Sequence, residues 1–350
     1  MKLEKRLKAF ADLGKILRDF VQGSFNGADK GMLEKIVDKA SYENPWFVKE
    51  HILYAFRSIG EMLHEAELKK WIKKYPELTE GRFNARRVGV VMAGNIPAVG
   101  FHDFLCVLMS GHHFAGKLSS QDQVILPGLA GILTDLEPGF KDSISFTEGI
   151  LENFDAIIAT GSDNSARYFE YYFGRYPSII RKNRNGIAVL NGNENDEDLS
   201  RLAKDIFLYF GLGCRNVSKL YVPQNYDFDK LVKNFRKYEY VIDNHKYRNN
   251  YDYFKSIYMI NQEEYHDNGF VLLKEDRRIA SPVSVLLFEK YNDTESVNSI
   301  IEERKEEIQC IVSKLKDIKN KKIEFGQSQD PGISDYADDI DTMRFLNFLN

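Results

Sequence analysis

The residue best suited to covalent chemistry is Cys214, which lies in the glycine-containing stretch of residues 211–216. Glycines at such a point let the backbone approach a ligand closely or hold an unusual turn. Arg215 and the local backbone N–H groups would favour the thiolate, the form of cysteine that attacks a carbonyl carbon. A buried, inert thiol is the alternative interpretation of Cys214. It is the interpretation we give to Cys106, in an apolar run, and to Cys310, in a charged predicted helix.

Asn95 is the second candidate, in the run Gly94-Asn95-Ile96-Pro97 between a predicted strand and a predicted helix. The carboxyl end of a strand is where ligand sites form in α/β proteins. The side-chain amide could donate a hydrogen bond to a developing oxyanion. Asparagine is also a common helix cap, so a capping role explains the same residue.

Two other strand ends carry residues that suit a nucleotide. Lys117 ends a predicted strand, where it can reach ribose hydroxyls or a phosphate, although a solvated lysine fits the pattern too. Gly161 and Ser162 join a strand to a helix beginning near Asp163, whose backbone N–H groups could face a pyrophosphate. A capping turn explains these residues as well, and the sequence here is not the GxGxxG fingerprint of the Rossmann fold.

The elements that must position these residues follow from hydrophobic patterning. Short apolar runs at residues 87–94, 113–118 and 156–161 suit buried parallel strands. Residues 99–109 and 127–136, which lie between these runs, have helical length. This βαβα alternation predicts an α/β fold with a doubly wound sheet.

The same alternation continues through the second half of the chain. Further strands are predicted at residues 186–190, 217–222 and 284–288. An acidic turn at residues 193–198 can cap a helix at residues 199–210. The cysteine turn therefore lies between a predicted helix and a predicted strand.

The length of the chain fits two domains, because 350 residues exceed the size at which one hydrophobic core stops growing, about 250–300 residues. Apolar residues at helical spacing predict an N-terminal helical region at residues 1–80. We predict a nucleotide-binding domain at residues 81–195 and a catalytic domain with the cysteine nucleophile at residues 196–325. A C-terminal segment, residues 326–350, is expected to return to the cleft.

Composition argues against several classes of function. A net charge of −4, with 29% charged and 43% hydrophobic residues, lacks the basic excess typical of nucleic-acid binders. No stretch approaches ~18 uninterrupted apolar residues and the N-terminus lacks the apolar core of a signal peptide, so we predict no membrane span and a cytoplasmic location. Three cysteines without metal-ligand spacing predict neither a disulfide framework nor a zinc site. The adjacent His112 and His113 would point to opposite faces of a strand, so we predict no metal site.

In order and spacing these motifs resemble the aldehyde dehydrogenase superfamily, and within it the acyl-CoA reductase branch, the LuxC-like fatty acyl reductases. The resemblance extends from about Val88 to the C-terminus. It rests on residues 94–103, 110–112 and 117–120, and on residues 214–223. It implies an aldehyde dehydrogenase-like fold, with a doubly wound nucleotide-binding domain and an α/β catalytic domain after the N-terminal helices.

The resemblance also implies roles for individual residues. Cys214 matches the thiol nucleophile of the superfamily, and Asn95 matches its oxyanion asparagine. Lys117 matches the lysine that holds the adenosine ribose. Gly161 and Ser162 match the Gly-Ser pair that receives the cofactor diphosphate.

Ser119 and Ser120 follow in the motif of Lys117 and complete the implied cofactor-binding set. Ser120 occupies the place where NAD-preferring relatives often carry an acid that binds both ribose hydroxyls. Without that carboxylate a 2′-phosphate is not repelled, so NADPH is favoured over NADH as the cofactor.

Two departures from the superfamily pattern bear on the reaction. Hydrolytic dehydrogenases carry Glu-x-Gly-Gly just before the strand at residues 186–190, where this sequence has Arg181-Lys182-Asn183-Arg184-Asn185. No general base is supplied there, which disfavours attack of water on a thioester. The Glu-x-Phe-Gly-Pro motif, whose glutamate contacts the nicotinamide ribose, is replaced by a stretch that begins with Arg278.

We therefore expect an enzyme, an NADP-dependent oxidoreductase of the acyl-CoA reductase type. It would reduce a long-chain acyl-CoA or acyl-carrier protein to the aldehyde through an S-acyl-Cys214 intermediate. An aldehyde dehydrogenase acting in the oxidative direction and a non-catalytic subunit with a retained nucleotide-binding fold are the alternatives. The resemblance further implies a homo-oligomer or a fatty acid reductase complex.

Overall fold

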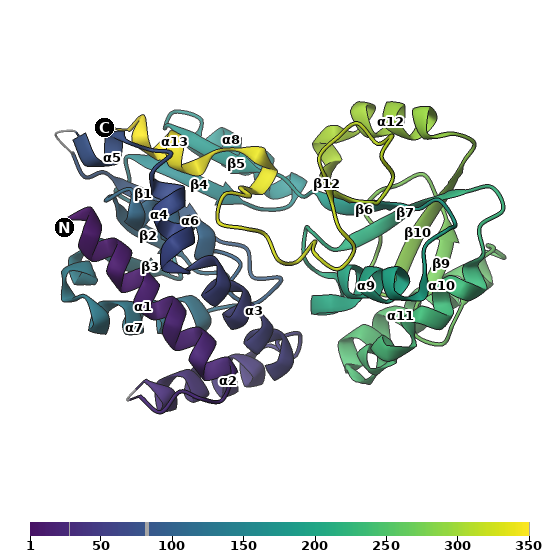
Figure 1. Cartoon of the computed structure of the whole chain (residues 1–350), viewed down its shortest axis with the longest axis horizontal. Helices are drawn as coiled ribbons and strands as arrows, with labels where there is room; N and C mark the ends of the chain where they lie inside the picture. The colour runs from purple at the N-terminus through teal and green to yellow at the C-terminus, as the bar shows by residue number, and fades with distance from the viewer. Residues whose placement is uncertain (28, 81–83, 350) are drawn as a thin grey trace. The chain divides into compact units, whose positions relative to one another are not determined.

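The chain divides into two compact units in the computed structural model, which describes residues 1–27, 29–80 and 84–349 (Figure 1). The first unit comprises Met1–Asn183 and Pro331–Asn350, and the second comprises Arg184–Asp330. Gly81, where the sequence predicts the start of the nucleotide-binding domain, lies outside the described residues.

The first unit contains a five-stranded parallel sheet in the order β3-β2-β1-β4-β5. Its strands are β1 (Arg87–Val91), β2 (His113–Lys117), β3 (Ile144–Thr147), β4 (Ala156–Thr160) and β5 (Ser178–Arg181). The central positions of β1, β2 and β4 are buried, which is why these strands stand out as short apolar runs. The chain runs from β1 through β2 to β3 and then crosses to β4 on the other side of β1. Ligand sites of α/β sheets form where the strand order reverses in this way.

Two of the helices that follow these strands, at residues 101–109 and 125–136, share one core with the N-terminal helices. The helices α6 (Phe101–Met109), α7 (Ile125–Leu136) and α8 (Asp163–Phe173) follow β1, β2 and β4. The N-terminal helices are α1 (Leu3–Val21), α2 (Lys30–Glu43), α3 (Lys49–Met62), α4 (Glu65–Ile72) and α5 (Glu77–Glu80). A single hydrophobic core contains Phe10 of α1, Trp71 of α4 and Phe104 of α6. The helices within residues 1–80 are thus part of the first unit and do not form a region of their own.

The second unit is built on a seven-stranded sheet in the order β12-β11-β6-β7-β10-β9-β8, parallel except for the pair β8 and β9. Its strands are β6 (Asn185–Val189), β7 (Val217–Pro223), β8 (His266–Asp267), β9 (Leu272–Glu275), β10 (Val285–Tyr291), β11 (Ile308–Val312) and β12 (Lys322–Ile323). Its helices are α9 (Asp196–Phe207), α10 (Phe228–Phe235), α11 (His245–Ile260) and α12 (Thr294–Glu303). The predicted α/β fold with parallel sheets is confirmed in both units.

Short 3-10 helices complete the description: η1 (Pro138–Ser143), η2 (Leu208–Gly211), η3 (Arg236–Asp243), η4 (Lys305–Glu307) and η5 (Ala337–Asp339). Within the described part of the chain, no helix has both the length and the apolar character needed to cross a bilayer.

The unit boundary differs from the one expected between residues 195 and 196. β6 pairs with β7 and β11, so its hydrogen bonds assign it to the second unit, which begins at Arg184. The chain returns to the first unit at Pro331, where α13 (Thr342–Asn347) packs on α6. In Figure 1 this returning segment is yellow.

Candidate active site

The strand ends that carry the predicted cofactor residues lie at one edge of the first sheet. β1 pairs in parallel with both β2 and β4, so the carboxyl ends of the three strands lie side by side. Lys117, the last residue of β2, is the partner of Val91 at the end of β1. Asn95 follows β1 and Gly161 follows β4. The fold therefore places these residues along the edge where the strand order reverses.

Lys117 is partly exposed and already has a partner within the unit. Its Nζ donates a hydrogen bond of 2.6 Å to the backbone oxygen of Gly149, in the loop between β3 and β4. A ribose hydroxyl or phosphate at this edge would share or replace that contact.

A carboxylate that the sequence analysis missed fixes the turn between β1 and α6. Asp122 Oδ2 accepts a hydrogen bond from the backbone N of Ala98 at 3.1 Å, and Oδ1 accepts one from the N of Ile125 at 3.1 Å. Ala98 has a left-handed φ of 57°, a conformation that needs support in a residue with a Cβ. Burial raises the pKa of Asp122, although the N–H groups favour its ionised form. The sequence signal that could have indicated this role is the position of Asp122 just before α7, where aspartate often accepts hydrogen bonds from backbone N–H groups.

Asn95 lies in this turn and does not cap the helix. α6 begins at Phe101, and Gly100 occupies its N-cap position. The capping interpretation of Asn95 is therefore wrong, while its role as an oxyanion donor stays a prediction. A Cβ on Gly94 would lie 2.5 Å from Ser119 Oγ, so the turns after β1 and β2 are in direct contact.

Ser119 and Ser120 differ in their contacts. Ser119 Oγ accepts a hydrogen bond of 3.2 Å from the backbone N of Gln121, whereas Ser120 is exposed. Ser120 is thus the more accessible of the two to a ligand at this edge, and its side chain is neutral.

Gly161 and Ser162 lead from β4 into α8. Ser162 is the N-cap, and its Oγ accepts a hydrogen bond of 3.3 Å from the backbone N of Ser165. A Cβ on Gly161 would lie 2.8 Å from Ser165 Cβ and 2.9 Å from the Phe169 ring, so a larger residue would displace the helix start. The capping turn considered for these residues is present. The first N–H groups of a helix are also the donors that bind a phosphate group.

In the second unit, Cys214 lies in a turn between η2 and β7. Tyr209, Phe210 and Gly211 have left-handed φ values of 55°, 58° and 74°. Such backbone is strained for the two aromatic residues and persists only where the surroundings hold it. The chain then turns at residues 213–216, with Cys214 as the first of the two central residues. The cysteine is partly exposed and precedes the amino end of β7.

The other two thiols are buried. Cys106 on α6 is 0% exposed, and burial raises the pKa of its thiol well above the ordinary value. Cys310 is 7% exposed, and burial raises its pKa to about 12. Cys310 lies on β11, so its placement in a helix is wrong; the short run Ile308–Val312 is a strand because it pairs with β6. Because the thiolate is the reactive form, Cys214 is the thiol best suited to attack a carbonyl.

Arginines with structural contacts lie in the two stretches where the sequence departs from the dehydrogenase pattern. Arg181, at the end of β5, is 4% exposed and forms an ion pair with Asp103 of α6, with Nη1 2.6 Å from Oδ2. Arg278, between β9 and β10, binds the carboxylate of Asp276, with Nη2 2.6 Å from Oδ2. Hydrogen bonds from Arg278 lower the pKa of Asp276 to about 2. Both arginines are therefore already paired with carboxylates.

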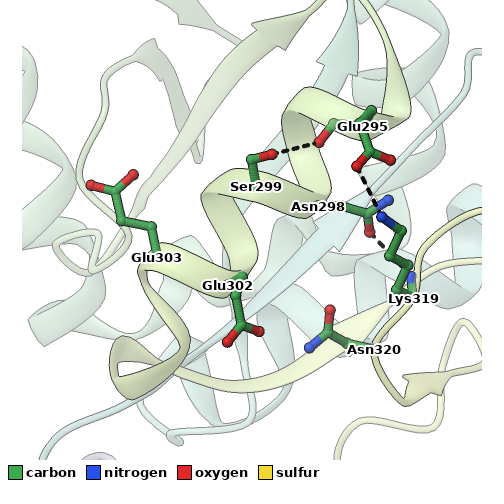
Figure 2. A pocket seen from close by; sticks show the side chains of 7 residues that line it. All are labelled: Glu295, Asn298, Ser299, Glu302, Glu303, Lys319 and Asn320. Atoms are coloured by element: carbon green, nitrogen blue, oxygen red, sulfur yellow. Dashed lines mark hydrogen bonds and ion pairs between the residues drawn. The ribbon is translucent and has the colours of Figure 1, made fainter.

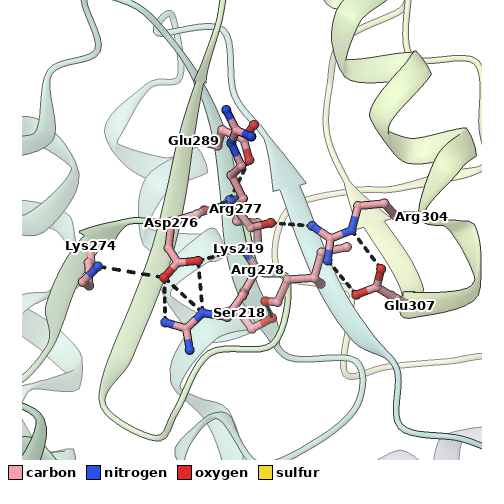
Figure 3. A network of polar contacts seen from close by, with 10 residues as sticks. Ser218, Lys219, Lys274, Asp276, Arg277, Arg278, Glu289, Arg304 and Glu307 are labelled. Atoms are coloured by element: carbon pink, nitrogen blue, oxygen red, sulfur yellow. Dashed lines mark hydrogen bonds and ion pairs between the residues drawn. The ribbon is translucent and has the colours of Figure 1, made fainter.

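A polar network connects the loop of Arg278 to β7 (Figure 3). Lys219 on β7 is 0% exposed, and its Nζ donates to Glu289 Oε2 at 3.0 Å and to the backbone oxygen of Asp276. Burial lowers the pKa of Lys219, and the carboxylate of Glu289 opposes this effect. Ser218 Oγ donates to the backbone oxygen of Ile279 at 2.8 Å. The strand that follows the cysteine turn is thus anchored to the β9–β10 loop.

A cavity of about 480 Å³ lies along α12, and none of the residues predicted for the site is among those that line it (Figure 2). It is lined by Glu295, Asn298, Ser299, Glu302, Glu303, Lys319 and Asn320. Across the described ranges, His, Cys, Asp and Glu side chains form no group of three or more suited to a metal ion.

Solved structures of aldehyde dehydrogenases share this fold. Aldehyde dehydrogenase 21 of Physcomitrella patens, in complex with the reaction product succinate, is 14% identical, with 91% of this chain and 74% of that chain covered and a TM-score of 0.64. The Mycobacterium tuberculosis aldehyde dehydrogenase complexed with NAD+ is 14% identical over 91% and 74% of the two chains, with a TM-score of 0.63. Aldehyde dehydrogenase C of Pseudomonas syringae, a mutant complexed with NAD+ and octanal, is 11% identical over 91% and 73%, with a TM-score of 0.62.

These likenesses establish the class of fold. No family model and no curated protein matches the sequence. The chain is an α/β protein with the aldehyde dehydrogenase fold, and the fold implied by its motifs is confirmed.

Proposed function

We propose that this protein is an NADPH-dependent acyl-thioester reductase of the LuxC-like type, which forms an aldehyde through an S-acyl-Cys214 intermediate. The observation that carries the proposal is the contrast among the thiols. Cys214 is partly exposed in the turn that follows the strained residues 209–211, whereas Cys106 and Cys310 are buried and their pKa values are raised. Only Cys214 combines access with the position that matches the superfamily nucleophile.

In the first step the Cys214 thiolate attacks the carbonyl carbon of an acyl-CoA or acyl-carrier protein. A carbon–sulfur bond forms to Cys214, the bond to the departing thiol breaks, and the acyl group remains on the enzyme. Asn95 and the backbone N–H of Cys214 are assigned to the oxyanion of this step. Addition of hydride to the acyl carbon and collapse then release the aldehyde and return the thiolate. The balance is acyl thioester, NADPH and a proton giving aldehyde, thiol and NADP+.

The carboxyl edge of the first sheet fits the nucleotide that the proposal requires. The edge lies where the strand order reverses, and Gly161 leaves no room for a Cβ at the start of α8. NADPH supplies the hydride when it is bound. Its binding is assigned to Lys117, Ser119, Ser120, Gly161 and Ser162.

The choice of NADPH is tested at Ser120, which is exposed and neutral. In Ser120→Glu a carboxylate would repel a 2′-phosphate, so kcat/KM for NADPH should fall relative to that for NADH. Ser120→Ala is the matched control, because it changes the same position without adding charge. An unchanged NADPH to NADH ratio in Ser120→Glu would contradict the assignment.

The reductive outcome is supported by the residues at the place of the dehydrogenase base. The stretch 181–185 at that place has no carboxylate, and its Arg181 is buried in an ion pair with Asp103, so this side chain cannot activate water. Formation of acid from aldehyde without CoA would instead favour the oxidative alternative. Absence of both nucleotide binding and thiol acylation would favour the non-catalytic alternative.

The central experiment labels the protein with radioactive acyl-CoA of several chain lengths and measures aldehyde directly with NADPH. Cys214→Ala should abolish the covalent label and aldehyde formation. Cys106→Ala and Cys310→Ala are the controls and should keep the label. Persistent labelling of Cys214→Ala would overturn the proposal. Sedimentation of the purified protein would test the homo-oligomer and reductase-complex predictions.

A further inference from the structure

The turn that carries Cys214 is closed by two hydrogen bonds between its ends. The backbone N of Asn216 donates to the backbone oxygen of Gly213 at 2.9 Å. In return, the backbone N of Gly213 donates to Asn216 Oδ1 at 2.8 Å. The two residues between them, Cys214 and Arg215, are therefore held in a short closed loop.

Asn216 also ties this loop to the end of α9. Its side chain is buried, and Nδ2 donates to the backbone oxygens of Asp205, Ile206 and Leu208 at 3.0, 3.3 and 2.9 Å. The last carbonyls of a helix have no partner within the helix, so one side chain satisfies the helix end and closes the cysteine turn. Both polar atoms of the amide are used, which fixes its orientation.

A second connection runs from Arg215 back to the same helix. Arg215 Nε donates to the backbone oxygen of Ser328 at 2.6 Å. The N and Oγ of Ser328 donate to Asp205 Oδ1 at 3.0 and 2.8 Å, and the N of Gly326 donates to Oδ2 at 2.6 Å. Asp205 and Ser328 are both 0% exposed. Asp205 thus holds the turn twice, through its backbone oxygen and through its carboxylate.

We propose that Asn216, Ser328 and Asp205 are positioning residues that fix the backbone of Cys214 for attack on the acyl carbonyl. The inference rests on the proposed function, in which Cys214 is the nucleophile. None of the three needs to touch the substrate. Their contacts fix the neighbours of Cys214 on both sides, and a nucleophile displaced by about 1 Å can lose on the order of 100-fold in rate.

The test measures site-specific acylation of Cys214 by peptide mapping in the full chain. Asn216→Ala and Ser328→Ala should lower the acylation rate constant at saturating acyl-CoA on the order of 10- to 100-fold, with a smaller change in the half-saturating concentration. Ser328→Ala removes a single hydroxyl, so it remains informative if Asn216→Ala does not fold.

Asn298→Ala is the matched control. Asn298 is likewise buried in the second unit, where Nδ2 donates to the backbone oxygen of Asp317 at 2.9 Å and Oδ1 accepts from the N of Lys319 at 3.1 Å. Its loss should reduce stability and leave acylation unchanged. Wild-type acylation rates in both Asn216→Ala and Ser328→Ala would overturn the inference.

Alkylation by iodoacetamide between pH 6 and 10 separates this inference from the proposed function, because it needs no acyl donor. The midpoint of the Cys214 pH–rate profile should shift in Asn216→Ala and Ser328→Ala, since Arg215 and the backbone N–H groups around the thiol move with the turn. It should stay in place in Asn298→Ala. An unacylated wild-type protein would refute the proposed function alone, whereas unshifted profiles would refute the positioning role.

Discussion

Arg181 and Asp103 form a buried ion pair whose removal has a calculable cost. Nη1 and Nη2 of Arg181 lie 2.6 and 3.0 Å from the two carboxylate oxygens of Asp103. Nη2 also donates to Thr342 Oγ1 at 2.9 Å. The pair therefore joins β5, α6 and α13 within the first unit.

In Arg181→Met the carboxylate of Asp103 stays buried without its partner. Breaking a buried pair from one side costs about 3–5 kcal/mol, so the free energy of unfolding of the first unit should fall by that amount at pH 7. Arg181→Met/Asp103→Leu should recover much of the loss, because neither charge remains.

Urea unfolding followed by tryptophan fluorescence measures this loss selectively. Both tryptophans, Trp46 and Trp71, lie in the first unit. Lys182→Met is the matched control, since Lys182 is the next residue and its ion pair with Glu170, at 3.2 Å, is about half exposed. Its loss should cost less than about 1 kcal/mol. Equal stability losses in Arg181→Met and Lys182→Met would refute the reasoning.

Three further predictions concern the cysteines, the carboxylate of Asp205 and the cap of α9. Iodoacetamide at pH 8 should modify Cys214 in the folded protein and should reach Cys106 and Cys310 only after denaturation, because burial raises the pKa values of these two thiols. Modification of Cys106 or Cys310 in the folded protein, detected by mass spectrometry, would contradict this prediction. Burial raises the pKa of Asp205 from 3.8 to about 6, so its contribution to stability should decrease by about 2 kcal/mol as the pH rises from 4 to 6. Asp205→Asn should remove this slope in circular dichroism unfolding, and an unchanged slope would count against the prediction. Asn195 and Asp198 form a capping box at the start of α9. Asn195→Ala should therefore lower the free energy of unfolding of the second unit by about 1 kcal/mol, and a loss below about 0.3 kcal/mol would show that the cap does not stabilise the unit.

Strands that form isolated apolar runs were predictable, whereas β5 and β11 were not. The apolar runs at residues 87–94, 113–118 and 156–161 contain β1, β2 and β4. β5, with only four residues, offers too few positions for a period to be recognised, and β11 lies next to charged residues that suggest a helix. The unit boundary depends on the pairing of β6 with β11, in which Asn185 is the partner of Ile308. Local patterning cannot reveal a pairing between residues so far apart in the sequence.

The same distinction applies to the candidate site. Cys214 and Gly161 could be proposed as site residues because glycine and position relative to a strand are local signals. Ser328 was missed, because it reaches the cysteine turn only through Arg215 and Asp205, which are far from it in sequence. Asp122 was missed because a helix-start aspartate reads as an ordinary cap until its bond to Ala98 is known. Side chains that hold a site are therefore harder to predict than those that perform its chemistry.

The contacts of Arg181 bear on the proposed absence of a general base in the stretch 181–185. A glutamate at this position would remove the guanidinium that binds Asp103. It would also place a second carboxylate beside the buried carboxylate of Asp103. Two like charges this close in a buried setting cannot both ionise, so Arg181→Glu should destabilise the first unit at least as much as Arg181→Met. The arginine thus has a packing role that a single substitution to glutamate would remove. In the proposed function, this packing is a physical reason why one substitution there should not restore hydrolysis of the acyl-enzyme.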